Sequence, residues 1–494
     1  MKNKVILLLI VLISTVVHSQ IVDIPDANFK YALVNYNVVD TNGDGEGDSV
    51  ADLNGDGEIQ VSEAEAVLSL DISYNDIVSV EGIESFTNVA TLICDHNDIV
   101  ILDLSQNLLL ESLNCFFNEI TDLDVSQNIN IRYLNCELNN LTSLDISNNI
   151  NLETLNCKRN EITGLNFLNN SNIEELRCSS NLLTYLDLSP LPNLITLFCT
   201  DNNISFINVS ENSNLELFNC AHNSLESIDV SNNHLLENLI CDNNNISSLD
   251  ISQNLNLIGI QCGENPISEL DVTNNILLEF LHIWYSTFTS IDISQNIHLK
   301  TLAAQGNLLS SIDVSQNINL EILYCWDNLL SELDISQNIN LEYLTCRNNQ
   351  LTNLNIKNGN NTLLTRFSAT GNQNLYCIQV DDEDFANSIF CEIAEYEWCK
   401  DDWAIYSEDC NLGIDVFFAT QIILYPNPVQ NALAIDNSSS YNITAIKIYD
   451  MLGKLVFTEN NPNNQLDVSS LNTGLFFVQL ETDKGVYTKK IIKE

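Results

Sequence analysis

The chain has 494 residues and is strongly acidic, with 67 Asp and Glu against 18 Lys and Arg and a formal net charge of −49. A surface of this sign repels nucleic acids and anionic membranes, so we do not expect either as a partner. The acidity is uneven, because the residues from Thr420 to the end contain six Lys and seven Asp or Glu. This step in composition predicts a domain boundary near residue 415.

The first 19 residues have the pattern of a secretory signal peptide. Lys2 and Lys4 precede an apolar run from Val5 to Val17, and cleavage is expected just before Gln20. No later stretch has the roughly 20 consecutive apolar residues that a membrane-spanning helix needs. We therefore expect an exported chain without a transmembrane segment, located in the medium or at the outer surface of the cell.

Residues 20–65 are predicted to form an amino-terminal cap with a helix from about Asp26 to Tyr36 and a calcium loop. In the stretch 52–63, the order Asp-x-Asn-x-Asp-Gly with Glu at position 12 matches a calcium-binding loop. Such a loop offers oxygens from side chains, from one backbone carbonyl and from a bidentate carboxylate, which suit a hard cation. The predicted ligands of this structural calcium ion are Asp52, Asn54, Asp56, Glu58, Gln60 and Glu63.

A second acidic segment lies just before this loop. It contains Asp40, Asn42, Asp44 and Asp48, but Ala51 stands where the loop pattern requires Glu. Its spacing resembles a thrombospondin type 3 calcium segment, which implies a second calcium ion. The alternative for this part of the chain is an acidic, Gly-rich linker.

Residues 66–376 are dominated by a repeat of 21 residues. Cysteine recurs at this spacing, and Ile283 and Ala304 occupy two positions of the series. The cysteines of the series are Cys94, Cys115, Cys136, Cys157, Cys178, Cys199, Cys220, Cys241, Cys262, Cys325 and Cys346. A fixed period sustained over this length predicts a stacked array in which each unit buries its apolar face against its neighbours.

The pattern inside one unit predicts how its chain runs. Leu113 and Cys115 are two residues apart, so on a strand both point into the core, and Leu123 and Val125 repeat this arrangement on the opposite side. We therefore expect two facing parallel sheets joined by tight bends, with the Asn118 amide satisfying backbone groups at a corner. The order Leu-x-x-Leu-x-Cys-x-x-Asn-x-Ile resembles the leucine-rich repeat in a short bacterial form, which implies a solenoid.

Two ladders of identical residues admit both a chemical and a structural interpretation. The cysteines could bind a metal or act in redox chemistry, but inward-facing thiols are better explained as small apolar core residues. An outer ladder of aspartates could collect cations, but a solvated face bonded to nearby Ser and Asn is favoured. Because like charges disfavour ionisation, we expect a raised pKa for some of them. This ladder comprises Asp103, Asp124, Asp145, Asp187, Asp229, Asp250, Asp271, Asp292, Asp313 and Asp334.

The remaining four cysteines lie in residues 377–414, which we interpret as a carboxyl-terminal cap and linker. An even, clustered set in an exported protein predicts disulfides, and three connectivities are possible. We favour Cys377–Cys410 with Cys391–Cys399, because this nested arrangement would clamp a cap on the open end of the solenoid.

Residues 415–494 show alternating strand patterns with turn signals near Gly453 and Gly485, which predict a small antiparallel β-sandwich. Tyr425-Pro-Asn-Pro, the turn Asp450-Met-Leu-Gly-Lys and the basic tail together resemble the type A sorting domain of type IX secretion. The resemblance implies that type IX secretion machinery carries the chain across the outer membrane of a Bacteroidota-type bacterium. It also implies that this domain is usually removed, leaving the remainder released or attached to the surface.

Aromatic residues gather on the inner sheet around the two interruptions of the cysteine series. Trp284 and Trp326 are two repeats apart, about 10 Å at strand spacing, with Ala303, Gln305 and Gly306 between them. This predicts a slot walled by two indoles, which suits protein hot spots or the flat faces of sugars. A chance enrichment or a contact with the cap is the alternative. The predicted ligand-binding residues are Phe280, His282, Trp284, Tyr285, Tyr324, Trp326 and Tyr343.

The predicted fold is a mainly β solenoid of leucine-rich repeats between the amino-terminal cap and the carboxyl-terminal sandwich. Our leading hypothesis is a monomeric, non-enzymatic recognition protein that binds an extracellular protein or glycan through the inner sheet. The competing hypothesis is a hydrolase acting on an extracellular polymer, or an accessory subunit of one. It is disfavoured because no nucleophile, base and orienting group converge, and His96 and His222 lie six repeats apart. A rigid scaffold without a ligand is a third possibility.

Overall fold

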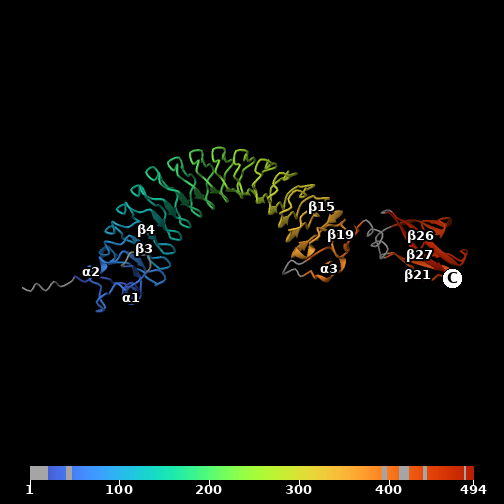
Figure 1. The fold of residues 1–494 in the computed structure, drawn as a ribbon, viewed down its shortest axis with the longest axis horizontal. Helices are drawn as coiled ribbons and strands as arrows, with labels where there is room; N and C mark the ends of the chain where they lie inside the picture. The colour runs from blue at the N-terminus through green and yellow to red at the C-terminus, as the bar shows by residue number, and fades with distance from the viewer. Residues whose placement is uncertain (1–19, 41–46, 392–397, 411–421, 438–441, 483–484) are drawn as a thin grey trace, which may run out of the picture. The chain divides into compact units, whose positions relative to one another are not determined.

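The computed structural model describes residues 20–40, 47–391, 398–410, 422–437, 442–482 and 485–494. The predicted signal peptide, residues 1–19, and the predicted ligands Asn42 and Asp44 lie outside these residues. By its contacts the chain divides into two compact units, Met1–Ile267 and Ser268–Glu494, which are described separately. Figure 1 shows the described helices and strands of each unit as a ribbon.

The first unit begins with the predicted helix. α1 (Ala27–Asn35) follows the N-cap residue Asp26, whose Oδ1 accepts hydrogen bonds from backbone N–H groups of the first turn. The other carboxylate oxygen of Asp26 accepts from the N–H groups of Val78 and Ser79, both at 3.0 Å. One carboxylate therefore caps the helix and ties it to the first repeat. The short helices α2 (Val61–Ala64) and η1 (Ile83–Ser85) complete the helical content of the described part of this unit.

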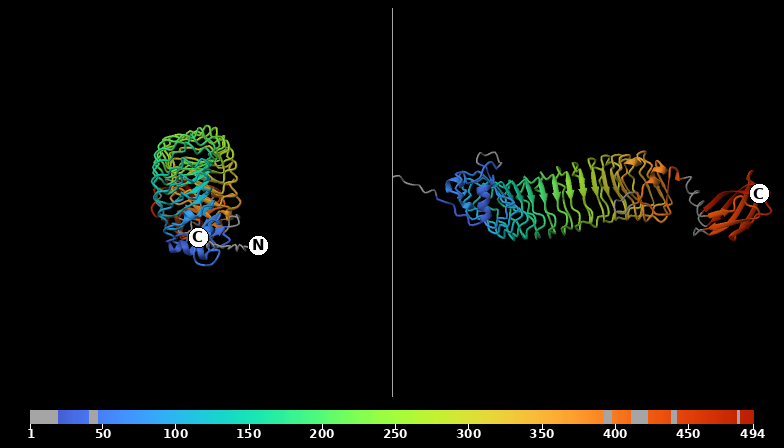
Figure 2. Two further views of the ribbon diagram at one scale, coloured as in Figure 1. Left: turned by 90° about the vertical axis from the view of Figure 1, so that its left-hand side faces the viewer. Right: turned by 90° about the horizontal axis from the view of Figure 1, so that it is seen from below.

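Each turn of the first unit contributes one three-residue strand to a parallel sheet, and the strands follow one another in chain order (Figure 2). Equivalent leucines are register partners, as Leu92, Leu113 and Leu134 show. β1 (Val39–Asp40) adds antiparallel to the first strand. The parallel strands are β2 (Ser69–Asp71), β3 (Thr91–Ile93), β4 (Ser112–Asn114), β5 (Tyr133–Asn135), β6 (Thr154–Asn156), β7 (Glu175–Arg177), β8 (Thr196–Phe198), β9 (Leu217–Asn219), β10 (Asn238–Ile240) and β11 (Gly259–Gln261).

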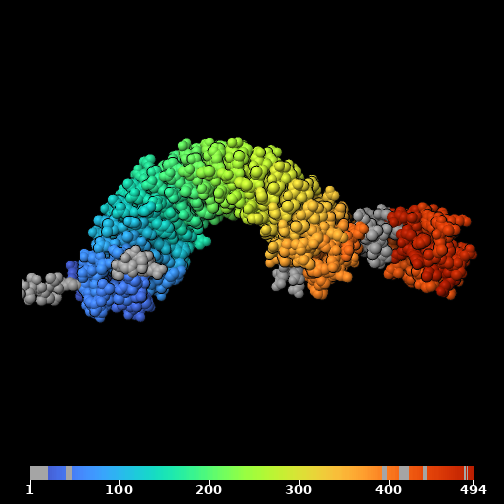
Figure 3. Space-filling view, viewed as in Figure 1, coloured from blue at the N-terminus to red at the C-terminus, as the bar shows by residue number. Residues whose placement is uncertain are grey.

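The cysteine ladder lies in the core, as the sequence predicts. All eleven cysteines of the series are free and buried, and they alternate with the leucines of the strands. Burial raises the pKa of the thiols, to about 12 for Cys157 and Cys199, so they remain protonated at neutral pH. The thiols therefore act as small apolar side chains in the core. The space-filling view shows the continuous outer surface that covers them in the first unit (Figure 3).

The corner asparagines satisfy backbone groups of two successive turns. Asn118 Oδ1 accepts from the N–H of Ile99 at 3.0 Å, while Asn118 Nδ2 donates to the carbonyls of Cys94 at 3.0 Å and Cys115 at 3.2 Å. The same bonds recur one turn later around Asn139. A second buried ladder uses its amide nitrogens in the same way, as Asn128 Nδ2 donates to Leu104 and Asn107 carbonyls. The predicted role of these amides is confirmed.

The outer side of the turns forms a hydrogen-bonded sheet only in part. In the second unit, four strands pair in parallel there, in the order β15 (Glu332–Asp334), β17 (Asn353–Asn355), β19 (Cys377–Gln379) and β20 (Ile405–Ser407). In the described part of the first unit, this side carries the isolated bridges Ser79–Ile101 and Leu186–Ile207. The predicted second sheet is thus restricted to the end of the repeats.

The prediction of raised pKa values in the aspartate ladder is wrong. At Asp124, hydrogen bonds from the hydroxyl and the backbone N–H of Ser126 lower the pKa of the carboxyl, and the N–H bond is 2.9 Å long. The equivalent bond at Asp103 comes from Ser105. These local bonds outweigh repulsion between charges that are screened by water. The pKa is lowered at Asp103, Asp124, Asp145, Asp187, Asp229, Asp271, Asp292 and Asp313.

The repeats of the second unit continue the same design, and a disulfide-bonded cap follows the last of them. The strand face of this unit, the surface formed by the three-residue strands, comprises β12 (Phe280–His282), β13 (Thr301–Ala303), β14 (Ile322–Tyr324), β16 (Tyr343–Thr345) and β18 (Arg366–Ser368). The cap includes η2 (Asn361–Leu363) and α3 (Glu383–Ser388). Cys377–Cys410 and Cys391–Cys399 are both formed, which confirms the favoured connectivity. Trp398 packs 5.3 Å from the ring of Phe367 and covers the last repeat.

Two antiparallel sheets form the carboxyl-terminal sandwich. One has the order β21 (Ile422–Tyr425), β22 (Ala432–Asn437), β25 (Gln465–Asp467), and the other has the order β24 (Leu455–Asn460), β23 (Ile443–Asp450), β26 (Gly474–Thr482), β27 (Gly485–Lys493). Leu433 and Leu466 of the first sheet share a core with Ile448 and Val478 of the second. Of these seven strands, β21, β23, β24 and β26 follow the alternating patterns of the sequence and β27 follows the predicted turn near Gly485, whereas β22 and β25 are found only in the structure.

We predict that Asn118→Ala lowers the free energy of unfolding by about 2–4 kcal/mol, because it leaves several buried backbone groups without partners. Urea denaturation of the full chain measures this loss. The matched control is Asn148→Ala, whose exposed amide donates one bond to the Ser126 carbonyl and whose loss should cost less than about 0.5 kcal/mol. Equal losses for the two variants would contradict a special role for the corner ladder.

We predict that the aspartate ladder stabilises the protein above pH 4 and loses this effect on acidification. The folded-state pKa lies below that of the unfolded chain, so the contribution is present above the unfolded pKa and disappears as the pH falls through the folded pKa. Replacing Asp103, Asp124 and Asp145 by Asn, which still accepts the turn bond as Asn208 does, should reduce the loss of stability between pH 7 and 3.

The control for charge alone is a triple variant at the exposed residues Asp98, Asp122 and Glu161, each changed to its amide. Melting temperatures measured across this pH range should depend less on pH in the ladder variant than in the control. The same pH dependence in both variants would show that general charge repulsion, and not the serine bonds, sets the acid response.

Candidate ligand-binding site

The predicted aromatic residues lie on the strand face of the second unit, but the expected slot between the two tryptophans is filled. The ring of Tyr285 lies above Gly306, where a Cβ atom would come within 2.4 Å of that ring. Tyr285 also meets the ring of Trp326 edge to face, with 5.7 Å between centroids. The small residue at 306 therefore accommodates a neighbouring aromatic ring instead of flooring an open slot.

The two ends of the aromatic group have different surroundings. His282 packs 5.0 Å from Trp284, and burial lowers the pKa of the His282 imidazole. Its Nδ1 atom is buried without a hydrogen-bond partner among the described residues. Phe280 stands beside this pair on β12 and is partly exposed. These residues form a packed, largely apolar surface.

An open cavity lies beyond Trp326, in the direction of the following repeats. It has a volume of about 230 Å³. It is lined by the aromatic residues Tyr324, Trp326 and Tyr343 and by Thr345 and Ser368, whose side chains bear hydroxyl groups. The structure therefore brings together three of the predicted ligand-binding residues here, Tyr324, Trp326 and Tyr343, whereas the other four do not line this cavity.

Two arginines that sequence reasoning missed complete the cavity. The guanidinium carbon of Arg347 lies 4.4 Å from the centre of the Trp326 ring, and that of Arg366 lies 5.3 Å from the centre of the Tyr343 ring. Such stacking orients a guanidinium while leaving its N–H groups available. The signal in the sequence is their rarity, because they are the only arginines after residue 177.

The predicted calcium loop, residues 52–63, is wrapped around two buried carboxylates. Asp52 is 5% exposed and accepts from the N–H groups of Gly55 and Gly57, each at 2.8 Å. Glu63 is 8% exposed and accepts three backbone N–H bonds, from Leu53, Asn54 and Gln60. Neither carboxylate has a Lys, Arg or His partner within the described residues. Buried charges without a counter-charge favour a bound cation.

The remaining loop residues supply oxygens on the same short segment. Asn54 Oδ1 and Asp56 Oδ1 accept the N–H groups of Asp56 and Glu58, and the side chain of Gln60 bonds to both Asn54 and Asp56. In the described part of the chain, no three His, Cys, Asp or Glu side chains are gathered as a ready metal centre. The donor set of carboxylates, amides and a carbonyl nevertheless fits calcium better than a softer metal. Of the residues predicted for the second calcium segment, the structure describes Asp40 and Asp48. Asp40 lies in β1, and the N–H of Asp48 donates to the carbonyl of Val39.

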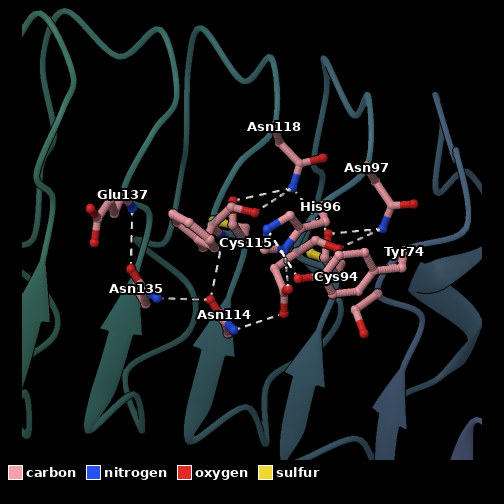
Figure 4. A network of polar contacts seen from close by, with 12 residues as sticks. Tyr74, Cys94, His96, Asn97, Asn114, Cys115, Asn118, Asn135 and Glu137 are labelled. Atoms are coloured by element: carbon pink, nitrogen blue, oxygen red, sulfur yellow. Dashed lines mark hydrogen bonds and ion pairs between the residues drawn. The ribbon is translucent and has the colours of Figure 1, made fainter.

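A polar network that the sequence did not indicate lies at the amino-terminal repeats (Figure 4). His96 Nδ1 lies 2.7 Å from Asp95 Oδ2, and His96 Nε2 lies 3.1 Å from the hydroxyl of Tyr74. The imidazole is stacked on Tyr74, at 4.0 Å between centroids, and on Phe117, at 5.1 Å. Asn114 extends the network by donating to Asp95 at 2.9 Å. The thiols of the same turns are buried, so the network has no nearby exposed cysteine nucleophile.

Comparison with protein families identifies the end of the chain. Residues 423–494 match the family described as the secretion system C-terminal sorting domain. This segment coincides with the antiparallel sandwich. The chain carries a secretion sorting domain.

The turn that opens the sorting domain is held by its last strand. Asn427 Oδ1 accepts from the N–H of Ile492 at 2.8 Å, and Asn427 Nδ2 donates to the carbonyl of Lys490 at 3.1 Å. The two motifs that carried the resemblance in sequence, Tyr425-Pro-Asn-Pro and the basic tail, are therefore in contact. At the β23–β24 turn, Leu452 is 93% exposed. The sorting domain indicates export, to the cell surface or the medium.

The repeats have the leucine-rich repeat fold. The functional domain of InlJ from Listeria monocytogenes, which includes a cysteine ladder, is 28% identical, with a TM-score of 0.67 over 96% of this chain and 98% of that one. An internalin from the same organism, InlF, is 23% identical over 64% and 93% of the two chains, with a TM-score of 0.56. A Leptospira interrogans leucine-rich repeat protein is 22% identical over 72% and 95%, with a TM-score of 0.54. The comparison with curated proteins gave no match.

These findings indicate an exported protein with the leucine-rich repeat fold. The similar solved structures also include a TDR receptor, which is 17% identical and shares the fold with a TM-score of 0.58. Among the described residues, no helix combines the length and the hydrophobicity needed to cross a membrane.

Proposed function

We propose that this exported protein recognises a protein or glycan ligand through the strand face of its second unit and does not act as an enzyme. The observation that carries the proposal is the cavity bounded by Trp326 and Tyr343, in which aromatic and guanidinium groups meet hydroxyl groups. Such a combination provides apolar contact area together with directed hydrogen bonds, which is typical of binding hot spots. A plant peptide hormone receptor of the same fold has been solved in complex with RGF2, which offers a parallel for peptide binding.

We also propose a structural calcium ion in the loop 52–63. Asp52, Asn54, Asp56 and Glu63 would supply side-chain oxygens, and Glu58 would supply its carbonyl. Gly55 and Gly57 adopt positive φ angles of 75° and 85°, which permit the tight curvature of the loop. The ion would neutralise the two buried carboxylates and so stabilise the cap against the first repeat. A second ion at Asp40 and Asp48 is a further part of this proposal.

Alanine substitutions at the cavity test the binding proposal. The full exported chain is screened on arrays of surface proteins and glycans, and the captured ligand is then titrated against variants. Trp326→Ala and Tyr343→Ala should each weaken binding by about 10–100-fold, because anchor residues of this kind contribute about 1.4–3 kcal/mol. Tyr185→Ala and Phe206→Ala are matched controls, since these exposed aromatics lie outside the strand face.

Unchanged affinity in correctly folded cavity variants would remove this surface from consideration. Turnover of a polymer on the array would instead favour the hydrolase hypothesis.

Calorimetric titration with calcium tests the loop. We expect saturable binding and a higher melting temperature of the first unit, both of which chelation should reverse, because the ion binds the folded state only. Glu63→Gln should abolish the response to calcium. Glu58→Gln should retain it, because position 7 contributes only its backbone carbonyl, although this variant loses the ion pair with Lys30. Retained calcium binding in Glu63→Gln would refute the proposed ligand set.

A further inference from the structure

We propose that the cavity beside Trp326 binds a single carboxylate group of a polypeptide whose surroundings are basic. This inference rests on the proposed function, because it assumes that the strand face of the second unit is the ligand-binding surface. It goes further by specifying the chemical group that enters the cavity and the charge of the partner.

The two arginines approach the cavity from opposite sides. Tyr343, Thr345 and Arg347 alternate along one turn, so their side chains share a face, with the Thr345 hydroxyl between the other two. Arg366 is the register partner of Tyr343 on β18, and Ser368 is the register partner of Thr345. Two guanidinium groups therefore flank a floor that carries the hydroxyls of Thr345 and Ser368. A carboxylate placed between them would meet donors from both sides and from below.

Both arginines lack an internal counter-ion. In the first unit, Arg132 and Arg177 form ion pairs with Glu153 and Glu175. Within the described residues, no carboxylate lies within ion-pair distance of Arg347 or Arg366, although the chain has 67 acidic residues. Arg347 Nε is in addition buried without an acceptor. Guanidinium donors match a carboxylate in a bidentate geometry, so an acceptor from a ligand is the partner they lack.

The surroundings of the cavity favour a basic partner over a polyanion. Asp327 directly follows Trp326, Glu342 directly precedes Tyr343, and Glu321 lies at the position equivalent to Glu342 one turn earlier. The chain as a whole has a net charge of −49. A sulfated or uronic polysaccharide would place further negative charges against this acidic rim and would be repelled. A basic polypeptide that inserts one carboxylate satisfies the two arginines and the acidic rim together.

Synthetic peptides provide the probe for this inference. Three lysine-rich heptapeptides are titrated against the full chain: one with a central Glu and an amidated end, one with a central Gln and an amidated end, and one with a central Gln and a free carboxyl end. Binding is followed by tryptophan fluorescence, and Trp326→Phe shows which part of the signal arises at the cavity. If binding reflects only general attraction to an acidic surface, the more positive amidated Gln peptide should bind more tightly than the two peptides that carry a carboxylate. The carboxylate inference predicts the opposite order of affinities.

We expect at least one of the two carboxylate peptides to bind about tenfold more tightly than the amidated Gln peptide, and the better one identifies a side-chain or a terminal carboxylate as the source. Arg347→Gln and Arg366→Gln should each abolish this advantage, whereas Arg159→Gln, which removes one exposed arginine from the first unit, should preserve it. No carboxylate advantage, or tighter binding of heparin than of any peptide, would overturn the inference.

The arginine variants also separate this inference from the proposed function. They remove charge but keep both aromatic walls of the cavity. If a ligand captured on the arrays depends on Trp326 and Tyr343 but not on the two arginines, the binding surface stands and the carboxylate inference fails. If that ligand depends on none of the four residues, both fail.

Discussion

The structure depends on the satisfaction of backbone groups at the corner that follows each short strand. Every turn leaves the strand after three residues, so N–H and carbonyl groups of the bend would be buried without partners. The Asn118 amide and its equivalents accept one N–H and donate to carbonyls of two successive turns. This constraint favours asparagine at one fixed position, where Ser286 is the exception within the series from Asn97 to Asn349, and the amides hold neighbouring turns in register. The leucine and cysteine ladders can then stack as identical layers.

The same constraint explains why one residue in each of these turns has a positive φ angle. The residue that precedes the corner asparagine has a positive φ angle in turn after turn, as at Phe117, Leu138 and Arg159. For non-glycine residues this conformation costs about 1–2 kcal/mol. It is maintained because the N–H groups of these residues extend the strand ladder, as Leu138 does by donating to Lys158. Side chains at this position are therefore free to vary, and Tyr285 and His96 use it to meet aromatic neighbours.

Because the core is regular, the turns differ from one another mainly in their surface residues. A buried thiol or leucine is specified by the layer above and below, whereas a strand-face residue is constrained only by the register of its neighbours. Differences between turns therefore accumulate where ligands can reach them. The cavity at Trp326 spans three such turns, and each of its arginines stands one turn after the aromatic residue on which it stacks. The aspartates of the outer ladder differ from these surface residues. Each accepts a hydrogen bond from the serine or threonine two residues later and so stabilises its own turn.

The sequence by itself determined the features that follow from period and spacing. A 21-residue interval assigns residues to the core, the corner or the surface, because every turn must present the same face to its neighbours. The paired cap cysteines and the motifs of the sorting domain were likewise evident from the residues, since covalent and turn chemistry is local. The helix that begins after Asp26 was evident from its pattern.

Tertiary structure alone decided how side chains on different turns use the space between them. The slot between Trp284 and Trp326 is occupied by Tyr285, and the open cavity lies one turn further on, because ring orientation depends on neighbours above and below. Arg347 and Arg366 became functional candidates only once they were seen stacked on Trp326 and Tyr343 without carboxylate partners. The lowered pKa values of the aspartate ladder also required geometry, because hydrogen bonds two residues away outweigh a repulsion that the sequence suggests. The 21-residue period determines how the turns stack, whereas side-chain contacts between neighbouring turns determine the shape of the cavity at Trp326.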